Sequence, residues 1–263
     1  MKLTDKVVVL TGGGTGLGQS TCIRFAKEGA DIVVCYHSSK AGAEETVRLI
    51  EAEGRRAIAV QCDVGNEESL KNLIRTAYDT FGRIDVLVNN SVVRYINGLD
   101  DIDDEGWDRS MNTNVRSCYI AAREVFPIMK AQGGGTIINV ASMHGVRPSC
   151  KTRLLYSTSK AAMIALTRAQ AAEMSPYNIF VNAIVLGSYP TPGAFQNHLA
   201  DMEDPSDRQK AIELYEAEDR PVPARRKGRM EESDECMLFL ANANNEFTTG
   251  SVMVADGGWT IID

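Results

Sequence analysis

The sequence of 263 residues predicts an α/β protein with a doubly wound parallel sheet and helices on both faces. Short β-branched, apolar runs alternate along the chain with longer amphipathic segments, which is the pattern of strands joined by helical crossovers. The first apolar run, residues 7–10, ends in a glycine-rich turn that leads into a helical segment. No linker-like stretch or change of composition divides the chain, so we expect a single domain over residues 1–263.

The expected elements follow in alternation. Strands are predicted at residues 7–10, 31–36, 57–62, 84–88, 136–140, 179–186 and 251–254. Helices are predicted at residues 20–29, 41–54, 67–81, 108–131, 156–174 and 233–240. Ligands bind at the carboxyl ends of the strands in such sheets. The polar or glycine residues at those ends are therefore expected on one rim: 12–18, 36–37, 63–64, 89–90, Ser142 and 187–188.

Composition limits the class of partner. The net charge of −7 gives no positive field for nucleic acid or an anionic membrane surface. The amino-terminal residues lack a signal-type apolar core, and residues 7–10 are far too short to span a membrane. Six cysteines are scattered singly, without metal-ligand spacing, as expected for free thiols in a reducing compartment. We therefore expect a cytoplasmic protein that acts on small molecules, without a metal site.

The glycine-rich turn, residues 11–18, lies between the first strand and its helix. Glycine lets the backbone approach a diphosphate closely, and the helix N-terminus offers free N–H groups and a positive dipole end. Turns also need glycine for purely structural reasons, so the flanking strand and helix are what favour a nucleotide site here.

Tyr156 and Lys160 are four residues apart and share one face of the predicted helix. A phenol is a poor acid or base at neutral pH, but an adjacent ammonium group stabilises the phenolate and lowers its pKa. Taken alone, the pair is more simply a helix bearing an aromatic side chain and a lysine. The other strand-end residues make an active site the better explanation.

Over essentially its whole length the chain resembles the short-chain dehydrogenase/reductase family. The matching motifs are Thr11-Gly-x-x-x-Gly16-x-Gly18, Asp63, Asn89-Asn90, Asn114, Ser142, Tyr156-x-x-x-Lys160 and Asp256-Gly257-Gly258 after Thr249-Gly250. Departures from the family pattern are Ser91-Val92 after Asn90, Leu186 before Gly187, and one extra residue between Ser142 and Tyr156. We expect these changes to alter the shape of the loops rather than to abolish activity.

The resemblance implies a Rossmann fold, a nicotinamide cofactor and reversible hydride transfer between an alcohol and a ketone. Tyr156 would act as general acid and base, and Lys160 would lower the pKa of Tyr156 and bind the nicotinamide ribose. Ser142 would donate a hydrogen bond to the substrate oxygen. Asn114 would help to hold Lys160 and a proton-relay water, and Asp63 would accept from the adenine amino group.

The resemblance also implies a set of cofactor-binding residues: Gly12, Thr15, Gly16, Leu17, Gly18, Tyr36, His37, Ser38, Asp63, Val64, Asn90, Tyr156, Lys160, Gly187 and Thr191. NAD-specific folds usually carry an acidic residue at the end of the second strand, where this chain has Tyr36. The polar residues 37–40 that follow are suited to a 2′-phosphate. We therefore favour NADP(H) over NAD(H).

The substrate would be set by a lid at about residues 187–228, the least regular part of the chain. Three classes of alcohol or ketone remain open: a hydrophobic molecule such as a hydroxysteroid, a sugar or polyol, and a 3-oxoacyl group on a carrier protein. The acidic surface of the lid argues mildly against the carrier. A catalytically inactive dinucleotide-binding regulator is the alternative function, and the family commonly forms homotetramers or homodimers.

Overall fold

The computed structural model describes residues 1–95, 98–148, 153–192, 222–242 and 244–262. Seven strands form one parallel sheet in the order β3-β2-β1-β4-β5-β6-β7. The chain starts in the middle of the sheet, builds outwards to β3 and returns to β4, so the doubly wound prediction is confirmed. The strands are β1 (Val7–Thr11), β2 (Asp31–Tyr36), β3 (Ala57–Gln61), β4 (Val86–Asn89), β5 (Gly135–Ser142), β6 (Ile179–Leu186) and β7 (Val252–Ala255).

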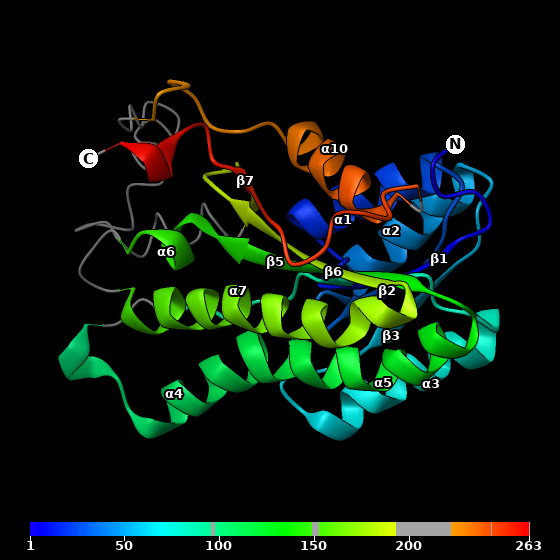
Figure 1. Ribbon diagram of the computed structural model, residues 1–263, viewed down its shortest axis with the longest axis horizontal. Coiled ribbons are helices and arrows are strands. Elements are labelled where there is room, and N and C mark those ends of the chain that lie inside the picture. Colours follow the sequence, from blue (N-terminus) through cyan, green and yellow to red (C-terminus); the bar gives the residue numbers. More distant parts are fainter. Residues whose placement is uncertain (96–97, 149–152, 193–221, 243, 263) are drawn as a thin grey trace.

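Helices cover both faces of the sheet (Figure 1). On one face lie α1 (Gly16–Lys27), α2 (Lys40–Ala52) and α10 (Met230–Ala241), and on the other lie α3 (Glu67–Phe81), α5 (Ser117–Ala131) and α7 (Leu154–Met174). The sheet has a hydrophobic core on each face. Alternate strand residues point to opposite faces, so Leu10 packs in one core and Val9 in the other. The remaining helical segments are η1 (Leu99–Asp101), α4 (Asp104–Met111), η2 (Asn112–Arg116), α6 (Met143–Val146), η3 (Ser175–Tyr177) and η4 (Trp259–Ile261).

Helices α1 and α10 begin at least three residues earlier than the sequence pattern predicted. Helix α1 starts at Gly16, inside the glycine turn. A Cβ atom on Gly18 would lie 2.0 Å from the Gly12 carbonyl oxygen, so glycine is needed there for the helix to approach the turn. Helix α10 starts at Met230, because Arg229 and Glu232 form a capping box that adds a first turn.

The predicted helix at residues 108–131 is instead α4, η2 and α5 in direct succession. η2 is a π-helical stretch, whose wider turn changes which side chains face the sheet. Asn114 lies in it and is completely buried. The apolar periodicity of a continuous helix does not reveal such a stretch, so the sequence prediction of one regular helix was wrong here.

The amino edge of the sheet carries a buried carboxylate. Asp85, just before β4, accepts from the Val7 N–H group at 2.9 Å, from Lys6 Nζ at 3.2 Å and from Arg83 Nε at 2.7 Å. A cavity of about 330 Å³ opens beside these residues. This cluster joins the starts of β1 and β4 at the edge opposite the carboxyl ends of the strands.

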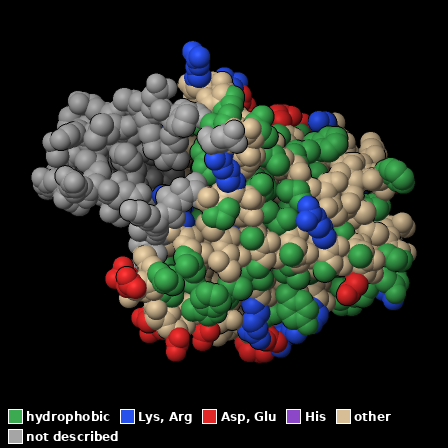
Figure 2. Space-filling model, turned by 60° about the vertical axis from the view of Figure 1, so that its left-hand side comes forward, with side chains coloured by type: hydrophobic (Ala, Val, Ile, Leu, Met, Phe, Trp, Pro, Cys, Tyr) green, Lys and Arg blue, Asp and Glu red, His purple; other side chains and the backbone are tan. Residues whose placement is uncertain are grey.

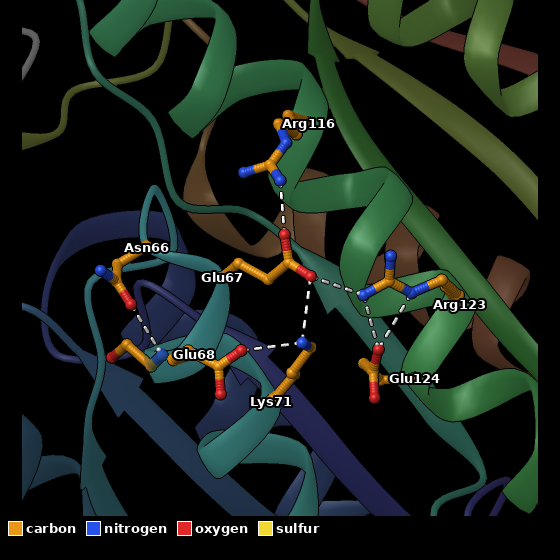
Figure 3. A network of polar contacts seen from close by, with 8 residues as sticks. Asn66, Glu67, Glu68, Lys71, Arg116, Arg123 and Glu124 are labelled. Carbon is orange, nitrogen blue, oxygen red and sulfur yellow. Dashed lines mark hydrogen bonds and ion pairs between the residues drawn. The ribbon is translucent and has the colours of Figure 1, made fainter.

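A second polar network lies on the helical layer of α3 and α5 (Figure 3). Glu67, in the first turn of α3, pairs with Arg123 of α5 at 2.9 Å, with Lys71 at 3.1 Å and with Arg116 of η2. Its hydrogen bonds from Arg123 and Lys71 lower the pKa of the Glu67 carboxyl group to about 2. The network thus links α3 to both η2 and α5.

The surface is mixed in charge. Lysine and arginine side chains stand singly on the face in Figure 2, between uncharged and acidic side chains. The described part of that face therefore offers no basic tract to nucleic acid. Within the described ranges, every helix is too short or too polar to cross a bilayer.

Candidate active site

A cleft of about 550 Å³ runs along the carboxyl edge of the sheet. The structure brings together there most of the predicted cofactor residues. Its lining includes Gly12, Thr15, Gly16, Leu17, Gly18, Tyr36, His37, Ser38, Asp63, Val64, Asn90 and Thr191. The carboxyl ends of β5 and β7 point to the same side of the molecule, where α6 and the start of α7 lie (Figure 1).

The glycine turn shapes one wall of the cleft. Gly12 and Gly16 have φ values of +72° and +56°, which side chains rarely tolerate. Thr15, the N-cap of α1, makes no side-chain cap hydrogen bond. The first N–H groups of α1 are therefore left for an anion, and the positive end of the helix dipole favours one. This turn and the open wall beside it fit the diphosphate of a dinucleotide.

The turn after β4 keeps its shape despite Ser91 and Val92. The Thr11 hydroxyl group accepts from the Asn90 N–H group at 2.9 Å and from the Ser91 N–H group at 3.0 Å. The Asn90 amide donates to the carbonyl oxygens of Thr11 and Gly12. Asn90 thus fastens the glycine turn to β4, besides lining the cleft.

Asp63 lies in the cleft but already has two partners. One carboxylate oxygen accepts from the Gly65 N–H group at 2.9 Å, and the other pairs with Arg109 at 2.8 Å. The hydrogen bond from Arg109 holds the pKa of the Asp63 carboxyl group below its usual range. Arg109 also lines the cleft, and sequence reasoning missed it because the pair is distant along the chain.

The end of β2 carries the residues that bear on cofactor choice. Tyr36, His37 and Ser38 line the cleft, and no acidic residue stands among them. Lys40, which the sequence also offered for a phosphate, pairs with Glu44 at 3.7 Å and is not part of the lining.

Ser142, Tyr156 and Lys160 come together at the end of β5. Ser142 ends β5 and caps α6, accepting from the His144 N–H group at 3.3 Å. Tyr156 and Lys160 lie in the first two turns of α7, and both are buried. Lys160 Nζ donates to the Val140 carbonyl oxygen at 2.6 Å and lies 6.0 Å from the centre of the Tyr156 ring.

The charges around Tyr156 favour its phenolate. Burial raises the pKa of the Tyr156 hydroxyl group, but the positive charges of Arg94 and Lys160 and the hydrogen bond with Ser142 more than offset it. The net pKa is therefore lowered. Burial also lowers the pKa of the Lys160 ammonium group, although Tyr156 and Cys118 oppose this effect.

Asn114 makes contacts that differ from those expected. Its side chain binds both sides of the Val93 peptide, with the Val93 N–H group donating to Oδ1 and Nδ2 donating to the Val93 carbonyl oxygen, each at 2.9 Å. Nδ2 also donates to Ser159 Oγ at 3.0 Å. The side chain therefore holds residues on either side of the site, and among the described residues it makes no hydrogen bond with Lys160.

Other predicted positions lie at or beyond the margin of the cleft. Gly187 packs against Asp256, where a Cβ atom would come within 2.6 Å of Asp256 Cα. Most of the predicted lid, residues 193–221, lies outside the described residues.

Five described cysteines are free thiols, and the described residues hold no histidine, cysteine or acidic cluster placed to bind a metal ion.

Comparison with known proteins places these features in a family. Residues 6–201 match the family described as short chain dehydrogenase. Glucose 1-dehydrogenase 2 of Bacillus subtilis is 31% identical over 98% of this chain and 96% of its own length. The NAD-dependent glycerol dehydrogenase of Listeria innocua is 31% identical over 98% of this chain and 95% of its own. Nothing in these relatives supports the alternative of an inactive regulator.

Solved structures agree with the sequence relatives. Levodione reductase superposes with a TM-score of 0.90 at 28% identity, covering 99% of this chain and 100% of that one. A short chain dehydrogenase from Burkholderia cenocepacia in complex with NADP superposes with a TM-score of 0.85 at 28% identity, covering 98% and 99%. The chain therefore belongs to the short-chain dehydrogenase/reductase family, and it is an oxidoreductase that binds a nicotinamide dinucleotide.

Proposed function

We propose that this enzyme interconverts a secondary alcohol and a ketone, with Tyr156 as general acid and base. The observation that carries the proposal is the meeting of three groups at one point: a buried phenol of lowered pKa, the Ser142 hydroxyl group and the Lys160 ammonium group. A phenol whose pKa is drawn towards neutrality can exchange a proton with a substrate oxygen.

The proposed proton path uses these three side chains. In oxidation Tyr156 takes the proton of the alcohol, and in reduction it returns that proton to the ketone oxygen. Ser142 donates a hydrogen bond to the same oxygen as its charge changes. Lys160 stabilises the phenolate and would hold the nicotinamide ribose. The bound dinucleotide supplies the hydride acceptor or donor.

The test of this assignment is Tyr156→Phe. The variant should lose turnover by several orders of magnitude, because phenylalanine lacks the hydroxyl group that exchanges the proton in the proposed path. Turnover is followed by cofactor absorbance with steroid, sugar and acyl-thioester substrates, and cofactor binding by fluorescence is the control. Normal turnover in the variant would contradict the role of Tyr156.

The proposed cofactor is NADP(H) in preference to NAD(H). Tyr36 stands where an acid would accept from the ribose hydroxyl groups, and His37 and Ser38 beside it offer polar groups to a 2′-phosphate. We expect a lower KM for NADPH than for NADH. Tyr36→Asp should reverse that order, because a carboxylate binds the ribose and repels the phosphate. A wild-type enzyme that favours NADH would refute the preference.

The remaining parts of the proposal concern context. The protein is proposed to work in the cytoplasm as a homotetramer or homodimer, with residues 187–228 as a lid over the substrate. The substrate classes stay those given above: a hydrophobic alcohol, a sugar or polyol, or a 3-oxoacyl group. Relatives named for glucose and for glycerol support the sugar or polyol class.

A further inference from the structure

A second cation stands beside the proposed catalytic tyrosine. The Arg94 guanidinium carbon lies 5.5 Å from the centre of the Tyr156 ring, closer than Lys160 Nζ at 6.0 Å. Arg94 is exposed and lines the large cleft, whereas Lys160 is buried. Of the two cations, Arg94 is therefore the one that a substrate in the cleft can touch.

The backbone that carries Arg94 is fixed by the fold. Asn114 binds the N–H and carbonyl groups of Val93, the preceding residue, and reaches Ser159 with the same side chain. Ser159 Oγ in turn donates to the Tyr156 carbonyl oxygen at 2.9 Å. A buried chain of hydrogen bonds thus joins the segment before Arg94 to the helical turn of Tyr156.

Arg94 makes no ion pair with any carboxylate among the residues that the structure describes. Arg109 in the same cleft pairs with Asp63 at 2.8 Å, and Arg83 pairs with Asp85 at 2.6 Å. A guanidinium group presents a planar fork of N–H donors that matches a carboxylate in bidentate geometry. The donors of Arg94 are thus available to an anion bound next to Tyr156.

We propose that Arg94 is a substrate-binding residue that holds a carboxylate, and that the substrate is a hydroxy acid or the corresponding oxo acid. This inference rests on the proposed function. A single guanidinium group suits one planar, singly charged carboxylate better than a phosphate dianion, which usually has several donors. In oxidation the alcohol carbon gives a hydride to the oxidised nicotinamide, the hydroxyl proton passes to Tyr156, and the oxo acid is released.

The closeness of Arg94 to Tyr156 also limits the substrate. The carboxylate must lie within a few bonds of the reacting carbon, because one end of the molecule contacts the guanidinium group and the other the phenol. The suitable probes are 2-hydroxybutanoate and 3-hydroxybutanoate, each compared with its methyl ester. The ester keeps the reacting alcohol, removes the negative charge and adds one methyl group.

The experiment measures kcat/KM for each acid and its ester in the wild type, Arg94→Gln and Arg94→Lys. Both members of a pair use the same tyrosine, so their ratio cancels any general effect of the variant on Tyr156. Arg94→Gln should lower the acid-to-ester ratio by roughly tenfold to a hundredfold, as for loss of a charge-assisted hydrogen bond. The acid-to-ester ratio of Arg94→Lys should lie between those of the wild type and Arg94→Gln, since lysine keeps the positive charge but lacks the forked pair of N–H donors.

The matched control is Arg75→Gln, which removes the same charge from an exposed position on α3, where the side chain of Arg75 donates to Asn72 and to no other described residue. It should leave the ratio unchanged. An acid-to-ester ratio that is equal in the wild type and Arg94→Gln, or a wild type that prefers every ester, would overturn the proposal. Thermal unfolding of each variant checks that it is folded.

Binding without turnover separates this inference from the proposed function. Tyr156→Phe loaded with NADPH is titrated with 2-oxobutanoate, and the fluorescence of the bound cofactor is followed. Adding Arg94→Gln should weaken that binding at least tenfold. If binding depends on Arg94 while no alcohol is oxidised, the carboxylate site stands and the proposed function fails. If neutral alcohols are oxidised and the acid does not bind, the carboxylate site fails alone.

Discussion

Two opposing effects act on the ionisation of the Tyr156 hydroxyl group. Burial opposes ionisation, and two nearby cations favour it. Burial is the largest single effect on its pKa, yet the charge of Arg94, the charge of Lys160 and the Ser142 hydrogen bond together lower that pKa. The charges of Arg94 and Lys160 both favour the phenolate, although the sequence motif contains only Lys160. Arg94, which lies outside the motif, therefore also lowers the pKa of the Tyr156 hydroxyl group.

This balance predicts a pH effect. On the proposed mechanism Tyr156 must be ionised for oxidation, so kcat/KM should rise with pH and level off above the pKa of Tyr156. Arg94→Gln removes a positive charge that favours the phenolate, so the rising limb should move to higher pH. The measurement is a pH profile of kcat/KM with a neutral alcohol, for which carboxylate binding plays no part. A profile identical to that of the wild type would show that the charge of Arg94 does not reach the hydroxyl group.

At the scale of elements, the ends of β1 and β4 are held together at both edges of the sheet. At the carboxyl edge Thr11 and Asn90 exchange hydrogen bonds, and at the amino edge Asp85 accepts from Val7. Burial raises the pKa of the Asp85 carboxyl group, but hydrogen bonds from Arg83 and Val7 and the charge of Lys6 more than offset it. The net pKa lies below the usual value of a carboxyl group.

Asp85→Asn should therefore destabilise the protein in a pH-dependent way. A lowered folded-state pKa gives stability that is fully present above the ordinary aspartate pKa and is lost as the pH falls from there through the lowered folded-state pKa. Near pH 7 the variant should lose about 1–3 kcal/mol in free energy of unfolding, because Lys6 and Arg83 lose their partner. Below pH 4 or so the difference should shrink. Urea unfolding at a series of pH values measures it, and an equal difference at all pH values would contradict the mechanism.

At the scale of the whole molecule, much could be predicted from the sequence. Alternation of strands and helices predicts the sheet, and the parallel strands bring the residues at their carboxyl ends to one edge without any knowledge of side-chain contacts. Most of the predicted cofactor residues line one cleft for this reason.

What could not be predicted depends on contacts between distant residues. The position of Arg94 depends on Asn114, whose inward placement comes with a π-helical stretch that apolar periodicity does not reveal. The pairing of Asp63 with Arg109 joins two elements far apart in the chain. Sequence motifs identify side chains that recur at a site, whereas these contacts are visible only in the folded structure.

Because all seven strands are parallel, changes that affect stability and changes that affect substrate choice can be made at opposite edges of the sheet. The proposed chemistry occupies one edge of the sheet, and the buried ion pairs of Asp85 occupy the other. Between them lie strands packed on both faces. Engineering for heat resistance can therefore proceed around the amino-edge cavity, while substitutions that redirect substrate choice belong in the cleft and the proposed lid.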